Sequence, residues 1–285
     1  MKTFKKVMKF LLSLIIIVIF IYFVVYLFSG KNEIVLNKPH IKVIKLEGII
    51  VDSEKIVREL RKAEKNDFVK GVIIRINSPG GAVAPSQEIY KAIRKVKKPV
   101  YAAISTLGAS GGYYVAAACD KIYVLGGSIT GSIGVIMKFS NFKELYDKIG
   151  VKFESIKSGK FKDIGSSSRE MSKKERELLQ KAIDNVYNQF VNDILKTRHI
   201  SKDIIKKYAD GRILTGEQAF KLGFVDKIGT YYDAFEDMKK DFHLGDEVIL
   251  YEVKDKNSLL KELLEGVSKI RLLFNNSAVF YYLYE

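Results

Sequence analysis

Residues 72–81 read Val-Ile-Ile-Arg-Ile-Asn-Ser-Pro-Gly-Gly, a β-branched run that stops at a turn rich in proline and glycine. This pattern predicts a short buried strand that ends in a loop. A second apolar run, at 100–104, is followed by the glycine-rich turn Gly-Ala-Ser-Gly-Gly at 108–112. Because parallel α/β sheets gather functional groups at the carboxyl ends of their strands, the two turns are candidates for one site.

Strand-like and helix-like segments alternate around these two runs. Strands are also predicted at 43–46 and 122–125. Apolar spacing predicts helices at 53–63, 86–96, 110–118, 172–197, 201–209, 216–222 and 230–241. In the longest of these, Ser172 and Glu175 have the spacing of a capping box. Short buried strands joined by helices imply an α/β layered fold with a largely parallel sheet.

Composition excludes several classes of protein. The chain has 285 residues, 47% hydrophobic and 28% charged, which favours a globular domain over disorder. A single cysteine, Cys119, excludes a disulfide framework and a cysteine-based zinc cluster, and we interpret it as a buried packing residue. The net charge is +15, but residues 1–31 contribute five lysines and no acid. The remaining positive charge is spread among acidic residues, so nucleic-acid binding is not predicted.

The N-terminus contains an apolar stretch at 10–28, 19 residues without a charge. A helix of this length spans ~28 Å, close to the thickness of a bilayer's hydrocarbon core. Bulky aromatic residues end the stretch, and the small-residue pattern of a cleaved signal peptide is missing, so we predict a signal anchor. Four lysines precede it, which predicts a cytoplasmic N-terminus and an extracytoplasmic remainder: Lys2, Lys5, Lys6 and Lys9.

The predicted organisation has five parts. They are a cytoplasmic N-terminus (1–9), a transmembrane anchor (10–28), a linker (29–40), an extracytoplasmic α/β domain (41–272) and an aromatic C-terminal tail (273–285). One hypothesis for the tail is that it occupies the substrate groove of a neighbouring subunit. The alternatives are that the tail packs on its own domain or contacts lipid headgroups.

Ser110 lies in the second glycine-rich turn, at the predicted start of a helix. Free backbone N–H groups and the helix dipole favour negative charge there, as the oxyanion of an acyl-transfer reaction requires. Glycines on both loops would let a substrate carbonyl approach backbone donors closely. Ordinary turn glycines with an N-cap serine are the alternative reading. A nucleotide site is not predicted, because the glycine cluster at 126–134 lacks the lysine of a phosphate-binding loop.

A nucleophilic serine needs a base, and the three histidines are poorly placed for that role. His40 lies in the linker, and His199 and His243 lie in charged, peripheral segments. A Ser-His-Asp triad is therefore disfavoured, which leaves a lysine as in Ser-Lys enzymes. Composition alone does not choose among so many lysines, although Lys162 has apolar neighbours in the sequence.

Four stretches in this order carry a resemblance to a known family: 77–81 (Asn-Ser-Pro-Gly-Gly), 109–114 (Ala-Ser-Gly-Gly-Tyr-Tyr), 130–135 (Thr-Gly-Ser-Ile-Gly-Val) and 157–164 (Lys-Ser-Gly-Lys-Phe-Lys-Asp-Ile). The chain resembles signal peptide peptidases of the short, single-domain SppA type, which are membrane-anchored serine proteases with the Clp-protease/crotonase-like fold. The resemblance extends from about residue 41 to residue 240. It implies the following roles: Ser110 as nucleophile, Lys162 as general base, Ser132 as the hydroxyl that orients the lysine, and the N–H groups of Gly81 and Gly111 as the oxyanion hole.

The resemblance also implies partners. It implies a ring-like homo-oligomer in which neighbouring subunits contribute Ser110 and Lys162, and peptide substrates such as cleaved signal peptides at the bilayer. No metal, nucleotide or flavin cofactor is implied. Three alternatives stay open: a related protease specific for a membrane protein such as a stomatin-like partner, a crotonase-like acyl-CoA enzyme, and a non-catalytic membrane scaffold.

Overall fold

The computed structural model describes residues 6, 8, 11–20, 37–252 and 281–283, and the chain divides into two units, Met1–Asn37 and Lys38–Glu285. In the first unit, residues 11–20 are helical. Among the described residues, no helix has the length and apolar character needed to span a bilayer. The predicted anchor at 10–28 is described only over 11–20, and most of the linker at 29–40 also lies outside the described residues.

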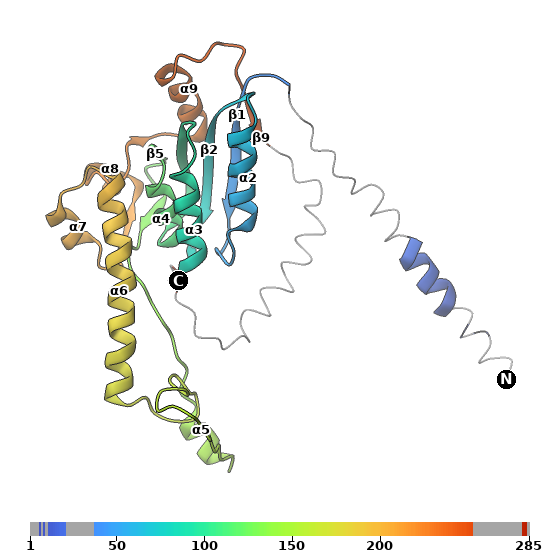
Figure 1. Cartoon of the computed structure of the whole chain (residues 1–285), viewed down its shortest axis with the longest axis vertical. Helices are drawn as coiled ribbons and strands as arrows, with labels where there is room; N and C mark the ends of the chain where they lie inside the picture. Colours follow the sequence, from blue (N-terminus) through green and yellow to red (C-terminus); the bar gives the residue numbers. More distant parts are fainter. Residues whose placement is uncertain (1–5, 7, 9–10, 21–36, 253–280, 284–285) are drawn as a thin grey trace. The chain divides into compact units, whose positions relative to one another are not determined.

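A mixed sheet forms the centre of the second unit (Figure 1). The strands run in the order β7-β6-β4-β2-β1-β9, and β5 pairs with β4 and β8. Their bounds are β1 (His40–Glu47), β2 (Val69–Ser78), β4 (Val100–Ala109), β5 (Lys121–Val124), β6 (Ile129–Gly131), β7 (Ile213–Thr215), β8 (Lys227–Ile228) and β9 (Ile249–Glu252). Every pair in this sheet is parallel except β6–β7, which confirms the predicted α/β fold with a largely parallel sheet.

Helices cover both faces of the sheet. Those of the described part are α2 (Glu54–Lys65), α3 (Val83–Ile93), α4 (Gly111–Ala117), α5 (Lys143–Lys148), α6 (Lys173–Thr197), α7 (Lys202–Tyr208), α8 (Gly216–Lys221) and α9 (Tyr231–Asp241). Successive strand residues point to opposite faces, so Ile74 packs in the cluster with α2, α3 and α4, whereas Ile73 packs with Met238 of α9. This double burial explains why residues 72–74 are all apolar.

The predicted strands and helices are present with small differences at their ends. The capping box is confirmed, because the Ser172 side chain accepts from the Glu175 N–H and Glu175 accepts from the Ser172 N–H. The apolar pattern did not predict α5 or the short strands β3 (Gly80–Ala82), β6, β7, β8, β9 and β10 (Tyr281–Leu283). Segments of two to six residues are too short for periodicity to show.

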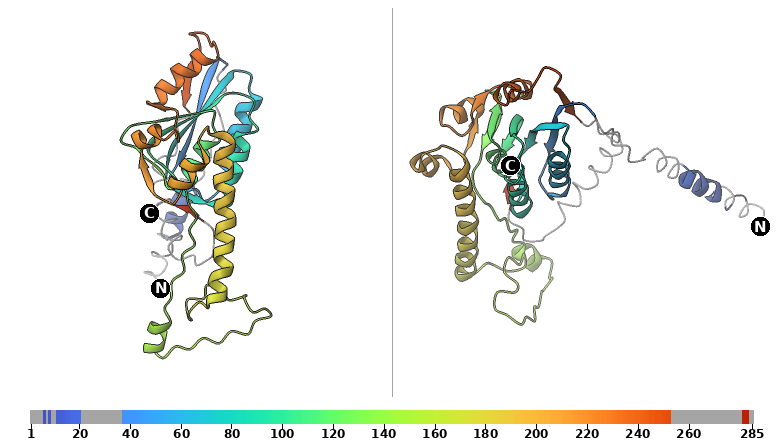
Figure 2. Two further views of the ribbon diagram at one scale, coloured as in Figure 1. Left: turned by 90° about the vertical axis from the view of Figure 1, so that its left-hand side faces the viewer. Right: turned by 45° about the horizontal axis from the view of Figure 1, so that its top comes forward.

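Residues 137–171, called the arm below, contain α5 and join the amino end of α6. Figures 1 and 2 show α6 extending past the sheet, with α5 near its far end. The apolar residues of α6 that are buried, Phe190 and Ile194, lie in its last part, against α4 and its neighbours. Apolar arm residues such as Phe153 and Ile156 are exposed, the latter to 98%. Among the described residues, these side chains of the arm therefore have little apolar cover.

Candidate active site

Ser110 lies at the junction of β4 and α4, in a left-handed backbone conformation with φ of 53°. Its N–H donates to Gly131 O over 2.8 Å, and its own carbonyl accepts from the Tyr114 N–H at 2.8 Å. A non-glycine residue in this region costs on the order of 1–3 kcal/mol, and such strain concentrates at functional sites. A sharp strand-to-helix turn of this kind presents a side chain at the carboxyl edge of a sheet.

Ser132 occupies the equivalent position after the neighbouring strand. It directly follows β6, has a φ of 50°, and donates its N–H to Arg212 O over 2.8 Å. Ala109 and Gly131 are register partners in the parallel β4–β6 pair. Both serines are buried and follow the aligned ends of two adjacent strands, so the fold brings Ser110 and Ser132 together.

The first glycine-rich turn packs against the same corner. A Cβ on Gly81 would lie 2.1 Å from Ile50 O, and a Cβ on Gly112 would lie 2.7 Å from Ser78 O. These contacts require glycine, because real Cβ atoms do not approach backbone so closely. Gly111 is the first residue of α4, where an amide has no intrahelical acceptor. The fold thus gathers four of the five predicted site residues at one corner: Ser110, Ser132, Gly81 and Gly111.

The strand β3, which contains Gly81, carries an added antiparallel strand. Residues 281–283 form β10, in which Tyr282 is the register partner of Gly81. In this single chain the segment pairs with its own β3, whereas the hypothesis for the tail placed it in a neighbour's groove. Within the tail at 273–285, only this strand belongs to the described residues. An extended peptide therefore fits beside the predicted oxyanion glycine.

Lys162 is the predicted site residue that the protomer does not bring to Ser110. It lies in a turn of the arm, donates its N–H to Gly159 O over 3.1 Å and is exposed. Among described residues its amine has no hydrogen bond or ion pair, and the same holds for the Ser110 hydroxyl. The arm is tied to Glu175 at one end of α6, while Tyr114 of α4 bonds to Asp193 near the other end. Glu175 and Asp193 are eighteen positions apart in the helix, a separation of about 27 Å along its axis.

Comparison with known proteins identifies the family. A family described as "Peptidase family S49" matches residues 92–245, and one described as "Clp protease" matches residues 39–128. The chain belongs to peptidase family S49.

Relatives of this S49 chain have related names. "Putative protease slr0021" of Synechocystis is 38% identical over 245 residues, which cover 84% of this chain and 88% of the relative. "Putative signal peptide peptidase SppA" of Enterococcus faecium is 36% identical, with 79% and 72% covered. "Protease 4" of Haemophilus influenzae is 32% identical, with 82% and 41% covered. The family and these relatives establish the S49 chain as a serine protease, as the resemblance implied.

Other titratable groups of the S49 domain have structural surroundings. Cys119 is buried, as predicted, and burial raises the pKa of its thiol. Asp120 accepts from the Val100 N–H over 2.9 Å, so it supports the start of β4. His40 packs edge-on against the Tyr251 ring, and His199 and His243 are exposed. None of them contacts Ser110.

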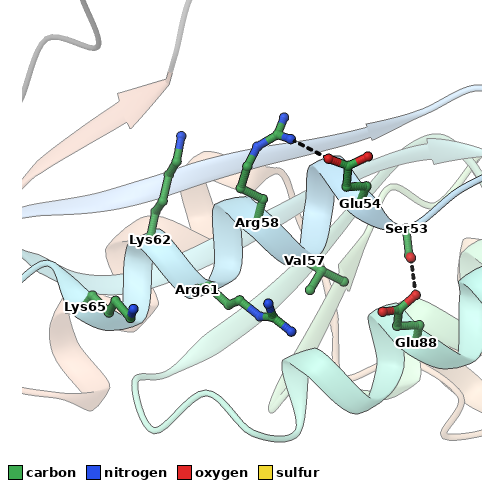
Figure 3. Close-up of a pocket in the computed structure, with 8 residues that line it drawn as sticks. All are labelled: Ser53, Glu54, Val57, Arg58, Arg61, Lys62, Lys65 and Glu88. Atoms are coloured by element: carbon green, nitrogen blue, oxygen red, sulfur yellow. Dashed lines mark hydrogen bonds and ion pairs between the residues drawn. The ribbon is translucent and has the colours of Figure 1, made fainter.

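A cavity of about 550 Å³ lies outside the predicted site, along α2 and near α3 (Figure 3). Its lining is mostly charged: Ser53, Glu54, Val57, Arg58, Arg61, Lys62, Lys65 and Glu88. The acids are engaged, since Glu54 pairs with Arg58 over 3.1 Å and Glu88 accepts from the Ser53 hydroxyl. None of the predicted site residues lines this cavity.

Proposed function

We propose that this S49 protease is a single-pass membrane endopeptidase that degrades cleaved signal peptides with a Ser110–Lys162 dyad. Residues 10–28 would anchor it, with the N-terminus cytoplasmic and the protease domain extracytoplasmic in the cell membrane. The observation that carries the dyad is the strained, buried Ser110 turn between two glycine loops, with no base beside it in the described protomer.

In the proposed reaction, the Ser110 Oγ attacks the peptide carbonyl while its proton passes to the Lys162 amine. The N–H groups of Gly81 and Gly111 stabilise the oxyanion of the tetrahedral intermediate. The lysine then protonates the departing amine, and an acyl-enzyme remains on Ser110. Water hydrolyses this ester with the same lysine as base. The Ser132 hydroxyl can bond the amine and direct it toward Ser110.

Pairing of β10 with β3 supports peptides as the substrate class. An extended peptide that adds a strand to an exposed edge gains backbone hydrogen bonds independent of its sequence. Such a peptide beside β3 passes Gly81, the partner of Tyr282 in the β3–β10 register. Its scissile carbonyl would therefore lie close to the proposed oxyanion donors. The anchor would hold this groove near apolar peptides left at the bilayer.

The exposed arm supports a homo-oligomer in which Lys162 acts on the Ser110 of a neighbour. Apolar arm residues that are exposed in the described part of the protomer would gain free energy by burial against a second copy. An isolated lysine amine has a pKa of about 10.4, so a base at neutral pH needs desolvation or nearby positive charge. An interface that closes over the arm would supply desolvation.

The test measures peptide hydrolysis by the full chain in phospholipid nanodiscs, with Ser110→Ala, Lys162→Ala and a co-assembled mixture of the two. We expect each variant alone to lose at least 10³-fold in kcat and the mixture to recover part of it. Recovery requires that intact Ser110 and intact Lys162 from different chains meet. Full activity of Ser110→Ala would refute the mechanism. Inactive mixtures of assembled variants would refute the shared site and leave a dyad within one chain.

A further inference from the structure

Arg169 connects the turn that carries Lys162 to the long helix α6. Its Nε donates to Asp163 Oδ2 over 3.0 Å, and one Nη also donates to the Asp163 carbonyl over 3.1 Å. The two Nη atoms donate to the two carboxylate oxygens of Glu175 over 3.0 and 2.6 Å. A fifth bond, of 3.0 Å, goes to Glu170 O. All five N–H donors of the guanidinium are therefore used.

Glu175 provides the fixed end of this connection. Its side chain is 5% exposed and also accepts from the Ser172 N–H over 2.8 Å, in the first turn of α6. Arg169, and then Ser172, lower the pKa of this carboxyl to about 2. A two-pronged arginine–carboxylate pair restricts both distance and orientation, whereas a single lysine contact does not. Arg169 is therefore held rigidly on α6.

The other end of the connection is the residue next to Lys162. The Lys162 N–H donates to Gly159 O over 3.1 Å, and the Ser166 N–H donates to Asp163 O over 3.1 Å, so one turn ends at the lysine and the next begins directly after it. Because the Lys162 amine has no partner among described residues, its direction in the protomer depends on this backbone alone. We propose that Arg169 is a positioning residue for Lys162, which holds the lysine-bearing turn on α6 and keeps the Asp163 carboxylate away from the lysine amine. This proposal rests on the proposed dyad.

The electrostatic half of the proposal follows from the partners of Asp163. The charged groups that face its carboxylate are Lys157 of the arm and Arg169, and Glu175 of α6 lies behind the guanidinium. Arg169, and then Lys157, hold the pKa of Asp163 well below its usual range. Without Arg169, one carboxylate oxygen becomes available to the adjacent lysine. An ion pair would then favour the ammonium form, which is unable to accept the serine proton.

The experiment compares Arg169→Met, Arg169→Lys and Arg169→Met/Asp163→Asn in the full chain, with kcat and KM measured from pH 6 to 10. We expect Arg169→Met to lower kcat on the order of 10²-fold at unchanged KM, because a misplaced base costs about that much. We also expect the midpoint of its pH–activity curve to move upward by about one unit. Arg169→Lys should lower kcat less than Arg169→Met does. In the double variant Arg169→Met/Asp163→Asn, the midpoint of the pH–activity curve should return to the parental value while kcat stays low.

The matched control is Arg58→Met, which removes an exposed arginine–glutamate pair of α2 and should leave kcat unchanged. The mass of the oligomer and the melting temperature are measured for every variant, so that a loss of assembly or of folding is recognised. An assembled Arg169→Met with parental kcat, or a fall in kcat without the pH shift, would overturn the proposal. Lys162→Ala in the same assay separates the two hypotheses: if it stays active, the dyad itself fails. If only Lys162→Ala is inactive, the dyad stands and the role of Arg169 fails.

Discussion

The serine and lysine sides of the proposed site differ in how far one protomer completes them. Ser110 and Ser132 are buried at aligned strand ends, and a Cβ on Gly81 or Gly112 nearby would collide with backbone atoms. Lys162 lies on an exposed arm, and no heavy atom lies within 4 Å of a Cβ built on Gly159. The core of the domain thus organises the proposed nucleophile, while the arm fixes its own backbone and exposes the apolar surface that we propose a partner covers.

Alanine at the two sets of glycines should show the largest contrast. Gly81→Ala places a Cβ 2.1 Å from Ile50 O, so β3 must shift. A shift near 1 Å is expected to lower kcat/KM about 10²-fold. The Cβ of Gly159→Ala would enter open space, so this substitution should change the free energy of unfolding by less than about 0.5 kcal/mol. Hydrolysis assays and thermal melts check both. Equal losses at the two positions would remove the contrast between the two sides.

A charge on the apolar surface of the arm tests whether that surface contacts a second copy. Ile156→Asp changes a side chain that is 98% exposed in the protomer, so folding should be unaffected. We expect the oligomer to dissociate and specific activity to fall at least tenfold at low concentration, because an unpaired charge would be buried at the interface. Tyr232→Asp, on an exposed part of α9, is the control. Analytical sedimentation gives the oligomeric state, and specific activity is measured on the same samples. An intact oligomer with Ile156→Asp would contradict the role of this surface.

Lowering the pH should weaken the attachment of the arm to α6 before it affects the sheet. We expect this effect to be smaller than those of the glycine and Ile156 substitutions. The pKa of Glu175 is lowered from 4.5 to about 2, so its ion pair stabilises the folded arm above pH 4.5 and is lost as the pH falls toward 2. Hydrogen exchange, corrected for its intrinsic pH dependence, should increase in residues 163–176 over this range while β2 stays protected. Glu175→Gln should remove the pH dependence. Simultaneous opening of β2 would contradict a separately held arm.

Much of the fold was predictable because its longer elements have strong local patterns. Residues 72–74 and 100–104 are apolar since both faces of the sheet are covered, and the capping box marks the start of α6. The Ser110 turn was recognisable from its glycines. Residue patterns did not predict β6 or β10, whose pairing depends on partners more than 20 and about 200 residues away, respectively. The contacts of Arg169 were missed for a different reason: its partners are only six residues away on either side, but hydrogen bonds between polar side chains leave no apolar periodicity. The charged residues between Lys157 and Glu175 were a visible signal.

The amino-acid sequence by itself determined the alternation of buried strands and helices, the two glycine-rich turns and the candidate serine. These features depend on periodicity and on backbone preferences over a few residues. Only the tertiary structure decided that Ser110 and Ser132 meet at the ends of β4 and β6, that β10 pairs with β3, and that Lys162 lies on an exposed arm clamped to α6. The strand pairings join residues distant in the chain, and the clamp depends on side-chain geometry, so no apolar period or turn signal in the sequence specifies either of them.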